Sequence, residues 1–126
     1  MRWILHGNLT PAVTDALVRH EQKASPASEL QLDAEASPLA FFKTAQSKQF
    51  DVLTTDAALI GAIFDEKIYF PRVVVYLQLE GGDIEQDDAI DRLFERYKRL
   101  SPGRLYTVTG SRVKIRQLPG SRLKEK

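Results

Sequence analysis

The side chains of this chain that could do chemistry follow three short apolar runs. The first run is Trp3–Ile4–Leu5–His6, and the others end at Leu32 and at Thr54. Imidazole, amide, hydroxyl and carboxylate groups stand at or just beyond the ends of these runs: His6 and Asn8, then Asp33 and Glu35, then Thr54, Thr55 and Asp56. The acids among them are possible ligands of Mg²⁺ or Mn²⁺, which prefer oxygen and can activate water against a phosphodiester.

Each of these candidates also has a structural interpretation. Asp56 is well placed to cap a helix that begins at Ala57, and Asp33 and Glu35 could be solvated loop acids. His6 could be a histidine that hydrogen-bonds near the end of a buried strand. The residue types and spacing alone do not decide between the structural role and the chemical role of these residues.

Several classes of function are excluded by what the sequence lacks. It has no cysteine and two histidines, which removes disulfides, thiolate catalysis and zinc-thiolate sites. Gly7 stands alone, and Gly81–Gly82 lacks the lysine of a phosphate-binding loop, so we expect no nucleotide cofactor. No Gly-x-Ser-x-Gly elbow is present, which disfavours acyl hydrolysis.

The length and composition predict one folded domain. The chain has 126 residues, of which 43% are hydrophobic and 28% charged. No apolar run approaches the roughly 20 residues of a membrane helix, so we expect no membrane association and a cytoplasmic protein. We predict a domain over residues 1–119 and a basic tail over residues 120–126.

Positive charge is concentrated at the C-terminal end. Residues 111–126 hold six basic residues and one acid, a net charge of +5, whereas the rest of the chain carries −4. This segment could be a solvated tail that keeps the protein soluble. The alternative is that it contacts the phosphates of a nucleic acid.

Strands and helices are predicted to alternate along the chain. Pro11 and Pro38 suit the first turn of helices capped by Thr10 and Ser37, and Asp83 with Gln86 resembles a capping box for the last helix. Residues 21–29 read as a loop. The expected strands cover residues 3–6, 30–32, 50–54 and 73–77, followed by a hairpin of 105–108 with 112–116, and the expected helices cover 11–20, 38–48, 57–64 and 83–100.

This pattern predicts an α/β protein, a three-layer α/β/α sandwich with a mainly parallel sheet and a C-terminal β-hairpin. Residues 73–77 are the predicted central strand, because they are apolar on both faces. Ligands of such sheets bind at the carboxyl ends of the strands, where the polar groups named above would gather. In the last strand, Arg112, Lys114 and Arg116 would share one face and could contact RNA.

Three segments resemble motifs of a known family. They are Ile4–Leu5–His6–Gly7–Asn8–Leu9–Thr10–Pro11, then Val52–Leu53–Thr54–Thr55–Asp56–Ala57–Ala58–Leu59, and finally Arg112–Val113–Lys114–Ile115–Arg116–Gln117–Leu118–Pro119. In this order they resemble the PIN-like domains, in particular the small stand-alone bacterial branch related to toxin ribonucleases. The resemblance implies an α/β/α sandwich whose acids bind Mg²⁺ or Mn²⁺ and cut RNA, with an antitoxin as a possible partner.

Most of the acids of that family are replaced here. His6 and Gly7 stand where an aspartate and a glutamate are expected, and Ala58 stands where a second acid of the third motif is expected. Ser37–Pro38 occupies the region of the helix-start acid, so that Asp33 or Glu35 would be a displaced substitute. Only Asp56 matches.

The resemblance therefore implies a toxin-type ribonuclease with an incomplete acidic site and weak or absent activity. Its metal ligands would be Asp56 and Asp33 or Glu35, with His6 or Asn8 holding the ion, a water or a phosphate oxygen, beside Thr54 and Thr55. The alternative is a non-catalytic module that binds RNA or protein. Leu30, Leu32, Phe41 and Phe42 could form a homodimer or antitoxin interface, or they could belong to the core.

Overall fold

The computed structural model describes residues 1–33 and 35–119. The predicted basic tail, residues 120–126, lies outside the described residues. The elements are β1 (Arg2–His6), α1 (Pro11–Arg19), β2 (Lys23–Pro26), η1 (Ala27–Leu30), α2 (Pro38–Ser47), β3 (Asp51–Thr54), α3 (Ala57–Asp65), β4 (Val74–Leu77), α4 (Asp83–Arg96), β5 (Arg104–Val108) and β6 (Val113–Gln117).

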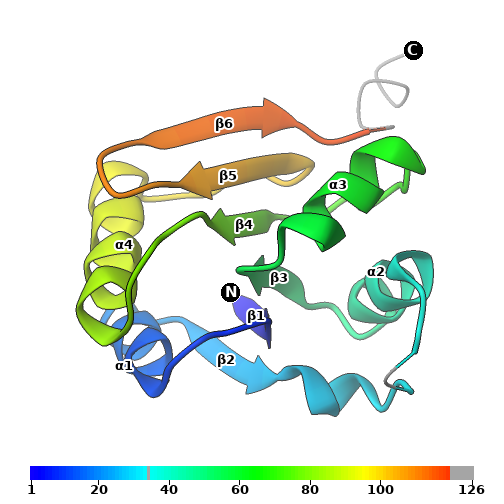
Figure 1. Cartoon of the computed structure of the whole chain (residues 1–126), viewed down its shortest axis with the longest axis horizontal. Helices are drawn as coiled ribbons and strands as arrows, with labels where there is room; N and C mark the ends of the chain where they lie inside the picture. The colour runs from blue at the N-terminus through cyan, green and yellow to red at the C-terminus, as the bar shows by residue number, and fades with distance from the viewer. Residues whose placement is uncertain (34, 120–126) are drawn as a thin grey trace.

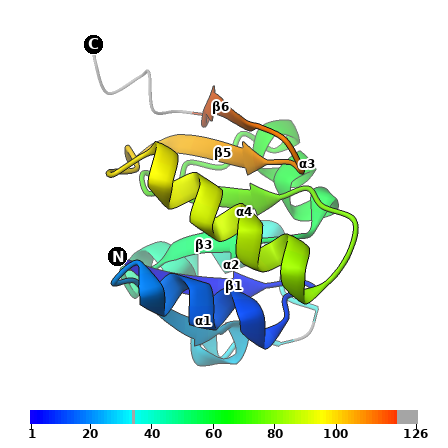
Figure 2. The same ribbon diagram turned by 90° about the vertical axis from the view of Figure 1, so that its left-hand side faces the viewer.

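The strands form one sheet in the order β2-β1-β3-β4-β5-β6. All neighbouring pairs are parallel except β5 and β6, which form an antiparallel hairpin. Helices α1 and α4 cover one face of the sheet, and α2 and α3 cover the other (Figures 1 and 2). The predicted three-layer α/β/α sandwich with a C-terminal hairpin is confirmed.

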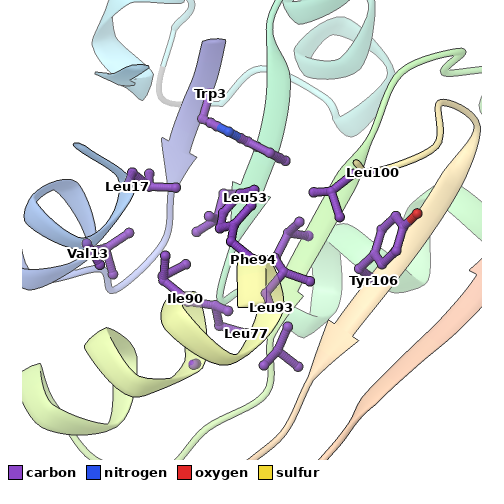
Figure 3. Packing of buried hydrophobic residues seen from close by; sticks show 14 of the residues in the cluster. Trp3, Val13, Leu17, Leu53, Leu77, Ile90, Leu93, Phe94, Leu100 and Tyr106 are labelled. Carbon is purple, nitrogen blue, oxygen red and sulfur yellow. The ribbon is translucent and has the colours of Figure 1, made fainter. Parts of the chain in front are cut away.

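The alternation of side chains along the strands divides the core into two clusters. Trp3, Leu53 and Val75 point toward α1 and α4, where Figure 3 shows Trp3 and Leu53 among side chains of these helices. Their chain neighbours Ile4, Val52 and Val74 pack under α2 and α3. Because β1, β3 and β4 are buried on both faces, they read as continuous apolar runs in the sequence.

The predicted strand over residues 30–32 is wrong, and so is the loop predicted over residues 21–29. The second strand is β2, in which Lys23 pairs with Arg2 and Pro26 with Leu5 at the edge of the sheet. Proline is tolerated on an edge strand, and the polar sequence of β2 has no period that signals burial. Leu30 ends the short helix η1 and is buried in the α2/α3 cluster, so its apolarity reflects packing and not strand pairing.

Two of the predicted helix caps are confirmed. Ser37 Oγ accepts a hydrogen bond from the Ala40 amide at 3.1 Å, and Asp56 Oδ1 accepts one from the Ala58 amide at 2.9 Å. The predicted cap by Thr10 is wrong, because its side chain makes no cap hydrogen bond to α1.

The capping box predicted for Asp83 and Gln86 is also wrong. The Glu85 carboxylate accepts a hydrogen bond from the Gly82 amide at 2.8 Å. The Gln86 side chain is buried and does not cap the helix. Helix α4 ends at Arg96, earlier than expected, although Leu100 beyond it is still buried in the core.

Among the described residues, no helix combines the length and apolarity needed to cross a bilayer. Three of the apolar side chains considered for an interface, Leu30, Phe41 and Phe42, are buried in the core of the protein itself, and Leu32 packs against their cluster.

Candidate functional site

A crevice opens at the carboxyl ends of β1 and β3, between η1 and the first turns of α2 and α3. Its volume is about 450 Å³, and its polar lining includes His6, Asp33, Asp56 and Ser37. Three of the predicted site residues thus lie around one space, although they come from segments far apart in the sequence. Glu35 does not line this crevice.

His6 is held in place by the neighbouring strand. His6 and Thr54 are partners in the register of β1 and β3, and His6 Nδ1 lies 2.9 Å from Thr54 Oγ1. The same oxygen accepts the Asp56 amide at 2.9 Å. Thr54 is fully buried, and its hydroxyl hydrogen needs an acceptor, which His6 Nδ1 supplies. We therefore assign Nδ1 as the acceptor, which leaves the proton of the neutral ring on Nε2.

Burial controls the charge of His6. Desolvation lowers the pKa of His6 from its ordinary value of 6.5, and the negative charge of Asp56 offsets part of that effect. The ring also contacts the buried Phe41, with the ring centroids 4.9 Å apart. The crevice thus has an aromatic wall and an imidazole whose neutral form is favoured near neutral pH.

The donor set of the crevice does not fit the divalent-ion centre that the family resemblance implies. One oxygen of Asp56 is used to cap α3, and one nitrogen of His6 is used by Thr54. Within the part of the chain that the structure describes, no group of three or more histidine, aspartate or glutamate side chains is arranged to hold a metal ion. Magnesium and manganese sites depend on converging oxygen ligands, and one imidazole with two carboxylates is a poor substitute.

The loop after β1 is fixed by two residues from elsewhere in the fold. Thr55 Oγ1 accepts the Asn8 amide at 2.8 Å. The buried Gln86 side chain, from α4, donates to the Asn8 carbonyl at 3.1 Å and accepts the Thr10 amide at 3.0 Å. Thr55, predicted to contact substrate, holds this loop through its hydroxyl.

The backbone at Gly7, where the family resemblance would expect a glutamate, has no room for a side chain. Its φ angle is +91°, and a Cβ atom added there would lie 2.4 Å from Thr55 Oγ1 and 3.2 Å from the Thr55 amide nitrogen. A side chain at this position would displace the hydroxyl that holds the Asn8 amide. The loop conformation is therefore built for glycine.

A row of polar residues continues from the crevice across the sheet. The strand register aligns His6 with Thr54, Thr54 with Tyr76, Tyr76 with Thr107, and Thr107 with Lys114. Sequence reasoning missed Tyr76 and Thr107, because each lies inside a strand-like run. Only the register of the strands brings them into line with His6.

The three basic residues predicted to share one face of the last strand differ in their surroundings, and Arg112 lies just before β6. All three are exposed. The guanidinium carbon of Arg116 lies 3.7 Å from the centre of the Phe64 ring on α3, a cation–π contact. Lys114 lines a second cavity of about 710 Å³, together with Arg92 and the acids Glu80, Glu85 and Asp88. Arg112 and Lys114 stand at the same edge of the sheet as the crevice, because β6 runs antiparallel to its neighbour.

Comparison with known proteins finds no matching family model, no matching curated protein and no matching solved structure. The class that the structure defines is an α/β/α sandwich with a crevice of mixed polar and apolar lining at the carboxyl edge of its sheet.

Proposed function

We propose that this chain is a PIN-like domain that binds single-stranded RNA along the carboxyl edge of its sheet and does not cut it with a metal centre. One observation carries this proposal. His6 stands where the family resemblance expects an aspartate, and its Nδ1 is bound to Thr54, so the position supplies a hydrogen-bond donor to the crevice in place of a carboxylate.

The dimensions of the edge suit a strand of RNA. The crevice lies at β1 and β3, and Lys114 lies four strands away from β1 on β6. At the usual strand spacing, these positions are roughly 19 Å apart, so a few nucleotides could contact both. Unpaired bases can enter a narrow crevice, whereas the bases of a duplex are stacked and paired. Arg112 and Lys114 would then contact phosphates.

Fluorescence anisotropy with a labelled single-stranded RNA, in the presence of EDTA, tests this proposal. We expect binding that weakens with salt, and an Arg112→Ala/Lys114→Ala variant that binds more weakly. The slope of log K against log salt should become shallower by about 1.4, because each lost phosphate contact removes about 0.7 on a single strand. Arg116 is left unchanged because it packs on Phe64.

Lys23→Ala is the matched control, because Lys23 is an exposed lysine on β2, at the opposite edge of the sheet. It should bind RNA like the parent. Absence of RNA binding at low salt, or equal binding by the double variant, would contradict the proposal.

A second candidate, a metal-dependent ribonuclease, is favoured by the fact that His6, Asp33 and Asp56 line one crevice. It predicts RNA cleavage in Mn²⁺ that Asp56→Asn abolishes, since asparagine keeps the helix cap but removes the charge. Our proposal predicts that neither protein cleaves. Cleavage by the parent and not by Asp56→Asn would make the protein an enzyme.

A further inference from the structure

We propose that the crevice is a binding pocket for a guanine base. The Asp56 carboxylate would accept hydrogen bonds from the N1–H and the N2 amino group of guanine, and His6 Nε2–H would donate to its O6. The base could belong to an RNA strand or to a free nucleotide. The RNA source rests on the proposed function, whereas the pocket itself does not.

The size and walls of the crevice fit a base. Its volume of about 450 Å³ lies in the range of small-ligand pockets and can hold a base with its ribose. Apolar side chains form much of the wall, among them Leu32, Phe41 and Leu59. A planar base needs apolar and aromatic surfaces of this kind. A phosphate is disfavoured there, because Asp33 and Asp56 would repel it.

The polar groups of the crevice have fixed hydrogen-bonding roles. Asp56 uses Oδ1 to cap α3, and Oδ2 has no hydrogen-bond partner among the described residues. An ionised carboxylate only accepts hydrogen bonds, and each of its oxygens has two lone pairs, so Oδ1 can accept one hydrogen bond from a base beside the bond that caps α3. Because His6 Nδ1 accepts from Thr54, Nε2 carries a hydrogen in the neutral ring and also in the protonated ring. The donor role of His6 is thus independent of its charge.

This combination of acceptor and donor selects among the bases. Guanine presents two adjacent donors, N1–H and the N2 amino group, next to the acceptor O6. Adenine and cytosine each present one amino group, and uracil presents one N–H. A carboxylate beside an N–H donor therefore satisfies all three groups of the guanine edge and fewer groups of any other base.

The pocket can be tested with free nucleotides, with no need for RNA binding. We would titrate ¹⁵N-labelled protein with GMP, IMP, AMP and UMP in EDTA and follow the backbone amides of residues 54–59. GMP should bind most tightly. IMP lacks the N2 amino group and should bind about tenfold more weakly, as expected for loss of one hydrogen bond to a charged acceptor.

Asp56→Asn should weaken GMP binding at least tenfold. The asparagine side chain is neutral and has one acceptor oxygen, so it cannot accept hydrogen bonds from both N1–H and the N2 amino group as a carboxylate does. Its matched control is Asp65→Asn, which removes the same charge from the other end of α3. That variant should bind GMP like the parent. Thermal melting of both variants establishes that each is folded.

Three results would overturn the pocket: equal affinity for the four nucleotides, unchanged GMP affinity in Asp56→Asn, or GMP binding that requires a metal ion and is abolished by EDTA. An oligo(U) RNA with and without one guanosine distinguishes the two sources of the base, an RNA strand and a free nucleotide. Preference for the RNA that contains guanosine supports a base that belongs to RNA. GMP binding without RNA binding supports the pocket and overturns the proposed RNA-binding function. RNA binding without a guanosine preference and without an effect of Asp56→Asn supports that function and overturns the pocket.

Discussion

A single hydroxyl group, Thr54 Oγ1, organises the crevice. It contacts the His6 ring and accepts the Asp56 amide, so it sets the orientation of the imidazole and the start of the turn into α3. Thr54 is fully buried, and no solvent can replace it. The chemistry of the crevice therefore depends on a residue that cannot itself reach a ligand.

Replacing Thr54 with valine keeps the shape of the side chain and removes both hydrogen bonds. We expect Thr54→Val to lower the free energy of unfolding by about 1–3 kcal/mol, because the partly buried Asp56 amide and an imidazole nitrogen lose their partner. Urea denaturation measures this loss. Thr54→Ser keeps the hydroxyl and is the control, and we expect it to keep the His6 contact. A Thr54→Val protein as stable as Thr54→Ser would show that the hydroxyl does not hold the crevice.

The buried position of His6 makes folding sensitive to pH. Because burial lowers the pKa of His6 below 6.5 in the folded protein, the unfolded chain binds this proton more readily. The contribution of His6 to stability is therefore complete above pH 6.5 and is lost as the pH falls from there through the folded pKa. We expect the melting temperature of the parent to fall more steeply from pH 7.5 to pH 5 than that of His6→Gln. Parallel curves would contradict this role.

At the scale of elements, the loop between β1 and α1 is held by α4 through Gln86. This glutamine supplies one donor and one acceptor to the loop backbone. It lies in an otherwise apolar stripe of α4, and it is buried. Helix α4 therefore supports the loop beside the crevice without contributing a side chain to the crevice.

Removing this support should loosen the loop. We expect Gln86→Leu to lower the free energy of unfolding by about 2 kcal/mol, because the Asn8 carbonyl and the Thr10 amide lose their partner. Gln86→Glu is the partial control, since its carboxylate still accepts the Thr10 amide but cannot donate to the Asn8 carbonyl. Hydrogen exchange of the Thr10 amide checks the effect. Faster exchange in Gln86→Leu than in Gln86→Glu is expected, and equal rates would contradict it.

The sequence predicted those elements whose signals are local. Pro38 and Ser37 mark the start of α2, and the apolar run before Tyr76 marks β4, because each signal depends on near neighbours. Strand β2 was missed because its identity comes from pairing with β1. The same contrast holds for the site. Asp56 was predicted because it directly follows a strand-like run. Gln86 and Tyr76 could not be predicted, because they reach their places only through the packing of α4 and the register of the sheet.

At the scale of the whole molecule, charged contacts join two helices far apart in the chain. Arg19 of α1 contacts Asp87 and Asp91 of α4, and His20 Nε2 lies 2.8 Å from Asp91 Oδ1. Partial burial acts to raise the pKa of Asp91, but the hydrogen bonds from His20 and Arg19 outweigh it, and the pKa is lowered. These contacts link the C-terminal end of α1 to α4.

The lowered pKa of Asp91 predicts part of the acid response of the fold. Its contribution to stability is present above the ordinary value of 3.8 and is lost as the pH falls through the folded pKa. We expect thermal denaturation between pH 5 and pH 2 to show a steeper loss of stability in the parent than in Asp91→Asn. Asp88→Asn, which lies on the same helix, should follow the parent. A parent curve that follows Asp91→Asn would rule out this ion pair as a source of acid sensitivity.

Strand β6 is the last strand of the sheet among the described residues, and no further described strand pairs with its outer side. Such an edge is a template on which a second molecule can add its own strand and extend the sheet. Arg112, Lys114 and Arg116 oppose this, because two copies paired along β6 would bring like charges together. These charges would thus disfavour pairing of two copies through β6, and we expect the Arg112→Ala/Lys114→Ala variant to show a larger mass than the parent by light scattering at the same concentration.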